Sequence, residues 1–122
     1  MAIGCAVALQ RGTPRPAVAT AATVWGTLAA NHAIKRVVRR SRPEGEHLPV
    51  ALIDAPASTS FPSSHAAMAA AAAMVLPPVV VPAVVVMAVS RVYLGVHYPS
   101  DVAAGVLVGV VCGAAGARLG DL

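Results

Sequence analysis

The sequence Ser-Arg-Val-Tyr-Leu-Gly-Val-His-Tyr-Pro-Ser-Asp occupies residues 90–101 and joins two strongly apolar segments. Pro99 and Asp101 are typical of the first turn of a helix, and they predict a helix that continues to about residue 117. The valine-rich residues 79–95 would suit a strand in water. A single strand cannot satisfy its backbone in a bilayer, however, so we expect a helix with proline in its first turn.

Two further helices are expected upstream of this turn. Residues 17–40 are apolar for two thirds of their length and basic at the end, as in a membrane-spanning helix. Residues 63–76 are rich in alanine, the best helix former, and prolines flank them on both sides. Residues 41–62 contain prolines and serines and predict an external loop. Residues 1–9 are too short to span a bilayer, and we interpret them as the end of a shortened helix.

Composition indicates that the surrounding solvent is a bilayer. The chain has 122 residues, enough for one domain, and 57% of them are hydrophobic with a mean hydropathy of +0.74. Alanine and valine dominate and aromatic residues make up only 3%, so a soluble core would lack large side chains. We therefore predict an all-α fold, a compact antiparallel bundle of transmembrane helices in one domain, 1–122, shortened at its N-terminus.

The charge balance indicates an anionic partner. The net charge is +4, but charged residues make up only 11% of the chain and no basic stripe alternates with stacking aromatics. Nucleic acid is therefore disfavoured, and a phosphorylated lipid satisfies both the charge and the apolar content. Cys5 and Cys112 have neither the spacing of a zinc site nor the density of a disulfide scaffold, so we interpret them as small hydrophobic residues.

Helix topology predicts where the polar residues meet. Each helix of an antiparallel bundle reverses direction, so alternate connections lie on opposite faces. Counting helix ends in this way places six polar residues on one face: Lys35, Arg42, His65, Arg91, His97 and Asp101. The prediction is a cluster of cations and two imidazoles that would suit a phosphate group at the membrane surface.

Three motifs carry a family resemblance. They read Lys35 followed by six residues and Arg42-Pro43, then Pro-Ser-Ser-His at residues 62–65, then Ser-Arg, five residues, His97, three residues and Asp101. In this order they resemble the phosphatidic acid phosphatase type 2 (PAP2), lipid phosphate phosphatase and vanadium haloperoxidase superfamily. The resemblance covers about residues 35–101. The small-residue composition, together with Phe-Pro-Ser-Ser-His, also resembles the actinobacterial decaprenylphosphoryl phosphoribose phosphatases within it.

The resemblance implies a role for each motif residue. His97 would be the nucleophile, Asp101 would orient it and His65 would protonate the leaving group. The phosphate would be bound without a metal or other cofactor by Lys35, Arg42, Ser63, Ser64 and Arg91. Ser64 stands where the family motif has glycine; serine keeps the backbone N–H donor but leaves less room. The expected enzyme is a phosphatase of the bacterial cell membrane that acts on a polyprenyl or glycerolipid phosphate through a phosphohistidine.

Other interpretations of the same residues stay open. Taken singly, either histidine would more often be structural than catalytic, and Arg91 and Asp101 would form an ion pair. Arg36, Arg39 and Arg40 have no motif role, and we interpret them as an anchor to lipid headgroups. The whole chain would also be compatible with a non-catalytic membrane scaffold or, less well, with a vanadate-dependent haloperoxidase. The lipid substrate, the side of the membrane and the oligomeric state are left open.

Overall fold

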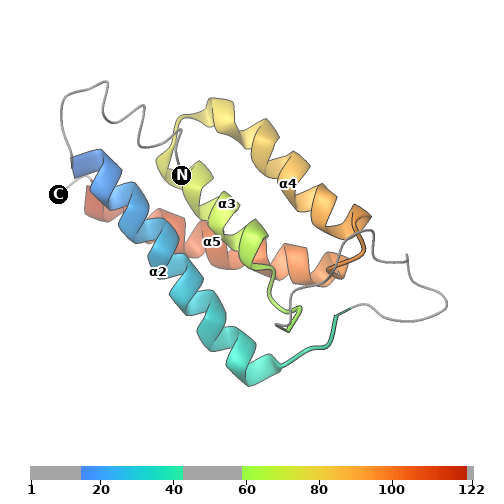
Figure 1. Ribbon diagram of the computed structural model, residues 1–122. Helices are drawn as coiled ribbons and strands as arrows, with labels where there is room; N and C mark the ends of the chain where they lie inside the picture. The colour runs from blue at the N-terminus through green and yellow to red at the C-terminus, as the bar shows by residue number, and fades with distance from the viewer. Residues whose placement is uncertain (1–14, 43–58, 121–122) are drawn as a thin grey trace.

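The computed structural model describes residues 15–42 and 59–120, and every regular element within them is helical. The elements are α2 (Arg15–Val38), α3 (Ser64–Val75), the short 3-10 turn η1 (Pro78–Val80), α4 (Val81–Tyr93) and α5 (Pro99–Gly120) (Figure 1). The predicted all-α fold is confirmed, and the four expected helices begin and end within about three residues of their predicted bounds. The predicted helix end at 1–9 and most of the predicted loop at 41–62 lie outside the described residues. That 1–122 forms one domain stays a prediction.

Short polar signals fix where the helices begin and end. Ser63 is the N-cap of α3, and its side chain accepts a hydrogen bond from the backbone N–H of Ala66. Leu76 ends that helix in an extended conformation immediately before two prolines. At the start of α5, a carboxylate oxygen of Asp101 accepts the backbone N–H of Tyr98 at 2.8 Å, which is one half of a capping box.

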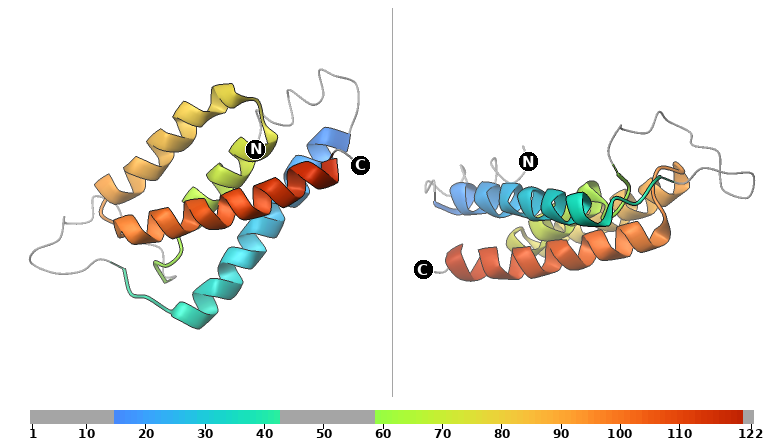
Figure 2. Two further views of the ribbon diagram at one scale, coloured as in Figure 1. Left: turned by 180° about the vertical axis from the view of Figure 1, so that it is seen from behind. Right: turned by 90° about the horizontal axis from the view of Figure 1, so that it is seen from below.

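Helix α3 is central and contacts α2, α4 and α5 (Figures 1 and 2). Its most extensive packing is against α5, where three glycines spaced four residues apart lie along the contact: Gly105, Gly109 and Gly113. A Cβ atom added at any of them would collide with α3. The two backbones therefore approach closely, as in small-residue helix pairs of membrane proteins.

The outer faces of the bundle are apolar. No residue of α4 is buried, and large hydrophobic side chains are exposed along α2, α4 and α5. Among the described helices, only the segment from Pro99 to Leu119 is both long and apolar enough to cross a membrane, judged by length and composition alone. The prediction of a helix at 17–40 is confirmed, whereas its crossing of a membrane stays a prediction.

The inner face of α2 is polar, contrary to its apolar appearance in the sequence. Its buried side carries a polar residue at every fourth position, namely Thr23, Thr27, Asn31 and Lys35. The two threonines donate to backbone carbonyls one turn earlier in the same helix, so their hydroxyls are satisfied. Asn31 and Lys35 instead reach other parts of the chain, at the end of the bundle where the predicted motif residues lie.

Candidate active site

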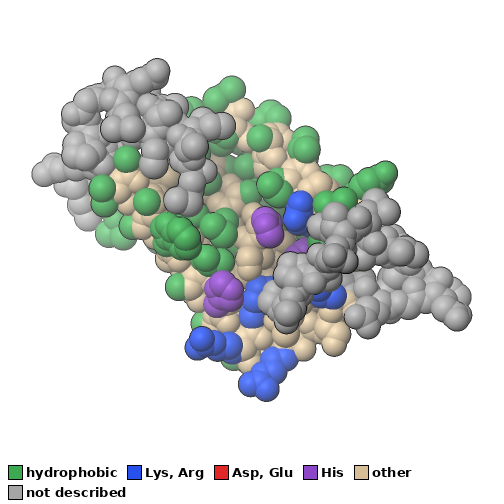
Figure 3. Space-filling view, in the orientation of Figure 1, with side chains coloured by type: hydrophobic (Ala, Val, Ile, Leu, Met, Phe, Trp, Pro, Cys, Tyr) green, Lys and Arg blue, Asp and Glu red, His purple; other side chains and the backbone are tan. Residues whose placement is uncertain are grey.

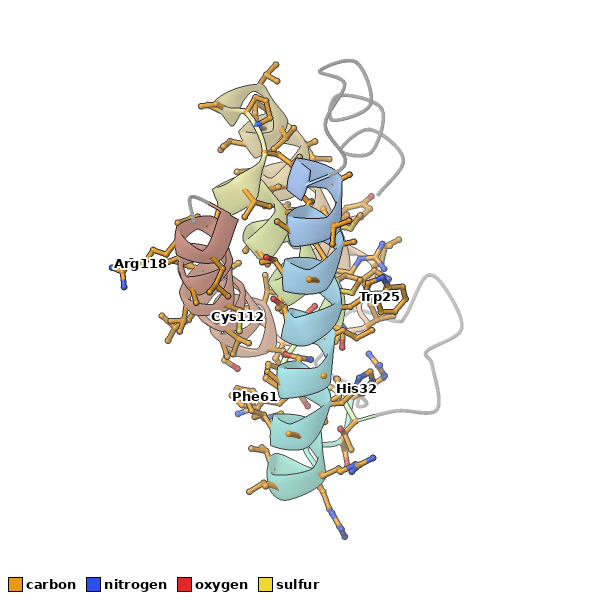
Figure 4. All side chains as sticks on the ribbon, turned by 90° about the vertical axis from the view of Figure 1, so that its left-hand side faces the viewer. Trp25, His32, Phe61, Cys112 and Arg118 are labelled. Carbon is orange, nitrogen blue, oxygen red and sulfur yellow. The ribbon has the colours of Figure 1, made fainter. Side chains whose placement is uncertain are left out.

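The eight predicted site residues come from four helix ends that lie at one end of the bundle (Figure 1). α2 and α4 finish there, and α3 and α5 begin there. On the face shown in Figure 3, the visible Lys, Arg and His side chains lie in its middle and lower part, while hydrophobic side chains dominate its upper and left parts. Arg118, near the end of α5, points outward and away from the other helices, whereas Phe61 lies lower in the same view, beside α2 (Figure 4).

His97 lies in the turn between α4 and α5 and is almost completely buried. Gly95, with a φ of 73°, provides the left-handed residue at which the chain leaves α4. Nη1 of Arg42 donates to the carbonyl oxygen of Val96 at 2.9 Å and lies 3.3 Å from Nε2 of His97. An anion held by Arg42 would therefore lie directly beside this ring nitrogen.

Burial sets the protonation state of His97. Desolvation is the main cause and the neighbouring Arg42 the second, and together they lower the pKa of His97 to about 4, although Asp101 acts in the opposite direction. Desolvation also lowers the pKa of Arg42. The imidazole is consequently neutral at physiological pH, the form in which a ring nitrogen has a free electron pair.

Asp101 lies on the other side of the His97 ring and is fully buried. Its Oδ2 atom is 3.6 Å from Nδ1 of His97, slightly beyond hydrogen-bond distance, and Nδ1 has no other hydrogen-bond partner among the described residues. The backbone carbonyl of Asp101 accepts the N–H of Ser63 at 2.9 Å, which joins the start of α5 to the start of α3. The Nδ1 side of the His97 ring thus faces the carboxylate without a hydrogen bond to it, and the role of Asp101 in orienting His97 stays a prediction.

Lys35 is the innermost cation of the site. It is buried, and its Nζ atom donates to the carbonyl oxygen of Thr59 at 2.7 Å. Its charge acts on both His65 and His97, so the buried ammonium lies near both imidazoles. A buried lysine that donates to a neutral carbonyl keeps donors for an anionic ligand.

The start of α3 holds the second predicted motif. Asn31 donates through Nδ2 to the hydroxyl of Ser64 at 2.9 Å and to the carbonyl of Pro62 at 3.2 Å. Ser64 therefore stands in place of glycine without a steric conflict, because its hydroxyl is bound by α2. Asn31 is fully buried and was missed by the sequence analysis, although its place one turn before Lys35 was a usable signal.

His65 and Arg91 form the side of the site nearest α3 and α4. His65 is exposed, in the first turn of α3, and the cations whose charges act on it are Arg91, Arg42 and Lys35. Arg91 lies in the last turn of α4, where its Nε is 3.5 Å from the hydroxyl of Ser90. The exposed imidazole and the buried one thus share Arg42 and Lys35, and Arg91 acts on His65 alone, on the accessible side.

Arg40 departs from its predicted role as a headgroup anchor. Its Nη1 atom donates to Oδ1 of Asp101 at 2.8 Å and to the hydroxyl of Ser100 at 2.7 Å. Asp101 therefore forms an ion pair with Arg40. The sequence left open an ion pair between Arg91 and Asp101, and none is found between them in the part of the chain that the structure describes. Arg40 lacks a motif position, and the sequence contained no signal that separated it from Arg36 and Arg39.

The arrangement is suited to an anion. Within residues 15–42 and 59–120, no three His, Cys, Asp or Glu side chains come together as metal ligands. Lys35 and Arg42 instead act on both imidazoles and Arg91 acts on His65, in the first turn of α3, where backbone N–H groups are available to an anion. The fold and the site together define a small helical protein with a cluster of cations and two imidazoles at one end of its bundle.

Comparison with known proteins gives the family. The PAP2 superfamily model matches residues 15–121, and the chain belongs to this superfamily. The protein is 47% identical over 87 residues to a decaprenylphosphoryl-5-phosphoribose phosphatase of Mycobacterium tuberculosis, with the same values in the CDC 1551 / Oshkosh and ATCC 25618 / H37Rv strains. It is 43% identical over 111 residues to the protein of that name from Mycolicibacterium smegmatis. The predicted resemblance, including the narrower branch, is confirmed.

The matches differ in extent. They cover 66% and 86% of this chain, but only 48% of the Mycobacterium tuberculosis proteins and 61% of the Mycolicibacterium smegmatis protein. The chain thus spans about half to three fifths of the length of these relatives. No solved structure matches it at a significant level.

Proposed function

We propose that the chain carries the active site of an integral membrane phosphatase that hydrolyses a phosphate monoester or diphosphate of a lipid. The observation that carries this proposal is the position of Arg42, whose Nη1 lies 3.3 Å from Nε2 of the buried, neutral His97. A phosphate oxygen that took over this guanidinium N–H would place the phosphorus atom next to Nε2 and release the electron pair of Nε2 for attack. Membership of the PAP2 superfamily supports the same chemistry.

The cations would hold the substrate and stabilise the transition state. Arg42 and Arg91 can each bind two phosphoryl oxygens, and Lys35 adds a compact charge from inside the bundle. The N–H groups at the start of α3, with the hydroxyls of Ser63 and Ser64, would complete the binding site. Charge on the phosphoryl oxygens is then compensated by side chains and backbone, which is the basis for proposing a metal-independent reaction.

The first chemical step would form a phosphohistidine. Nε2 of His97 attacks the phosphorus in line, the N–P bond forms, and the bond from phosphorus to the lipid oxygen breaks. His65, whose protonated form the bound phosphate would favour against the neighbouring cations, gives its proton to the departing oxygen. The positive charge that develops on the His97 ring faces Asp101, whose Oδ2 lies 3.6 Å from the Nδ1–H side of the ring.

The second step would release phosphate. His65, now neutral, takes a proton from a water molecule as that water attacks the phosphohistidine. The N–P bond breaks, inorganic phosphate leaves, and both imidazoles return to their starting protonation states. The exposure of His65 supports this role, because the attacking water must reach it from solvent.

The substrate would be a lipid whose head reaches the site from the membrane. The described helices expose apolar side chains on their outer faces, and α5 is long and apolar enough to span a bilayer. A lipid chain can lie against such faces while its phosphate enters the cationic end. The similarity to decaprenylphosphoryl-5-phosphoribose phosphatases favours a polyprenyl-linked phosphosugar over a glycerolipid phosphate.

Phosphate release from purified protein in detergent tests the proposal. Polyprenyl phosphosugars, polyprenyl diphosphates and phosphatidic acid are offered in parallel, with and without EDTA. We expect release that persists in EDTA and is abolished in His97→Ala. Release equal to that of the wild type from His97→Ala, or no release from any lipid phosphate, would leave the non-catalytic scaffold as the better account.

A further inference from the structure

We propose that Arg40 is a positioning residue for the reaction, because it fixes the Asp101 carboxylate in the orientation that faces His97. This inference rests on the proposed function, since it assigns Arg40 a task in the same site. Asp101 uses its two oxygens differently: Oδ1 is bound by Nη1 of Arg40 at 2.8 Å, and Oδ2 faces Nδ1 of His97 at 3.6 Å. Holding one oxygen determines where the other one lies.

The burial of Asp101 makes this contact important. Its side chain is fully buried, and an ionised carboxylate without a charged partner is costly in such a place. Arg40 supplies the compensating positive charge from the surface of the bundle, where 38% of its side chain is exposed. The backbone N–H of Tyr98 binds Oδ2 at 2.8 Å, so the two donors hold the carboxylate plane from both ends.

Arg40 is itself held in place by several contacts. Its guanidinium carbon lies 4.8 Å from the ring centroid of Phe61 and 5.7 Å from that of Tyr98, and its Nη1 also binds the hydroxyl of Ser100. Its backbone carbonyl accepts the N–H of Ser60 at 2.8 Å. A surface arginine that served only as a headgroup anchor would not need partners from the start of α5 and from the loop before α3.

The chain geometry after α2 directs Arg40 to this position. Arg39 adopts a left-handed conformation with φ 50°, and its N–H donates to the carbonyl of Lys35 as a helix cap. This cap ends α2 immediately before Arg40, which then reaches the first turn of α5. Two residues that follow α2 therefore act on opposite sides of the His97 ring. Arg42 lies at Nε2, and Arg40 binds Asp101, whose carboxylate faces Nδ1.

A double-mutant cycle separates positioning from a merely structural role. R40Q, D101N and the double variant are assayed for lipid phosphate hydrolysis, with R36Q as the matched control at an exposed arginine in the last turn of α2. We expect R40Q to lower kcat about tenfold with little change in KM, the order of a lost charge-assisted hydrogen bond. Because Arg40 acts through Asp101, the double variant should be no slower than D101N.

An NMR titration of histidine gives a second readout that does not depend on turnover. The charges acting on His97 are Arg42 and Lys35 from the end of α2 and Asp101 from α5, with His65 and Arg91 across the site on α3 and α4. Removing the guanidinium leaves the Asp101 charge uncompensated. The titration midpoint of His97 should then rise in R40Q, return toward the wild-type value in R40K, and stay unchanged in R36Q.

The possible failures are distinguishable. If R40Q and R36Q match the wild type in kcat and in the His97 midpoint while D101N is slow, the inference about Arg40 is wrong and the phosphatase proposal stands. The inference is also wrong if the double variant has a lower kcat than D101N by the same factor that separates R40Q from the wild type. If the wild type hydrolyses no lipid phosphate, the proposed function fails first. R40M, which removes the charge but keeps the length of the side chain, replaces R40Q if that variant does not fold.

Discussion

Replacing Gly105 by alanine is expected to damage both stability and activity, whereas the same change at Gly26 should be harmless. A Cβ on Gly105 would lie 2.5 Å from the carbonyl oxygen of Ser63 and 3.2 Å from the Cβ of Ala66. An ordinary contact between carbon and oxygen is about 3.3 Å, so the start of α3 must move by about 0.8 Å. A Cβ on Gly26 would meet nothing within 4 Å.

The two variants are expected to change the free energy of unfolding in opposite directions. Overpacking costs about 1–3 kcal/mol and alanine regains about 1 kcal/mol of helix propensity, so Gly105→Ala should lose up to about 2 kcal/mol of stability. Gly26→Ala should gain about 0.5–1 kcal/mol. Thermal unfolding in detergent should show Tm changes of roughly 4 °C per kcal/mol. Because Ser63 and His65 move with α3, the proposed phosphatase activity of Gly105→Ala should fall about 10- to 100-fold.

The matched pair makes the reasoning refutable. Both variants add one methyl group to a helical glycine and differ only in what that methyl group meets. If Gly105→Ala unfolds at or above the Tm of the wild type and Gly26→Ala behaves in the same way, the close α3–α5 contact does not position the site as described. If Gly105→Ala loses stability but keeps full activity, the link between this contact and the site is wrong.

Three further predictions concern the site itself. NMR titration of His97 should give a midpoint near 4, and a midpoint near the ordinary 6.5 would contradict its burial. The free energy of unfolding should fall as the pH is lowered from 6.5 toward 4, because the unfolded chain takes up a proton there that the folded chain does not. Asn31→Ala should lower the free energy of unfolding by about 1–3 kcal/mol, because the Ser64 hydroxyl and the Pro62 carbonyl lose their buried donor. Thermal unfolding that matches the wild type would contradict this expectation. Vanadate should inhibit phosphate release competitively, as a mimic of the five-coordinate transition state. Chelators should have no effect, and loss of turnover in EDTA would refute the metal-free mechanism.

The helices were predictable because their signals are local. Alanine propensity, prolines and capping residues are read within a few positions, and they placed α3 and α5 correctly before any tertiary contact was known. The convergence of the motif residues was also predictable, since antiparallel helices return alternate ends to the same face. Lys35 and His97, 62 positions apart, meet for that reason.

The contacts within the site were not predictable, because they depend on side-chain geometry between segments distant in sequence. Arg36, Arg39 and Arg40 are equivalent in composition, and only the left-handed turn at Arg39 separates Arg40 from the other two. Asn31 looked like one polar residue in an apolar helix. The pairing of its side-chain amide with Ser64 depends on how α2 packs against the start of α3. Sequence patterns therefore predicted which end of the bundle carries the site, and tertiary packing determined its hydrogen bonds.

The central claim is that His97 is the nucleophile, and trapping the covalent intermediate tests it most directly. Purified protein is mixed with a radiolabelled polyprenyl phosphosugar, quenched within the first turnover at alkaline pH to preserve phosphohistidine, and digested for peptide mapping. The account predicts label on the peptide that contains His97, lost in His97→Ala and retained in R36Q. Label on another residue, or turnover without any labelled protein, would contradict it.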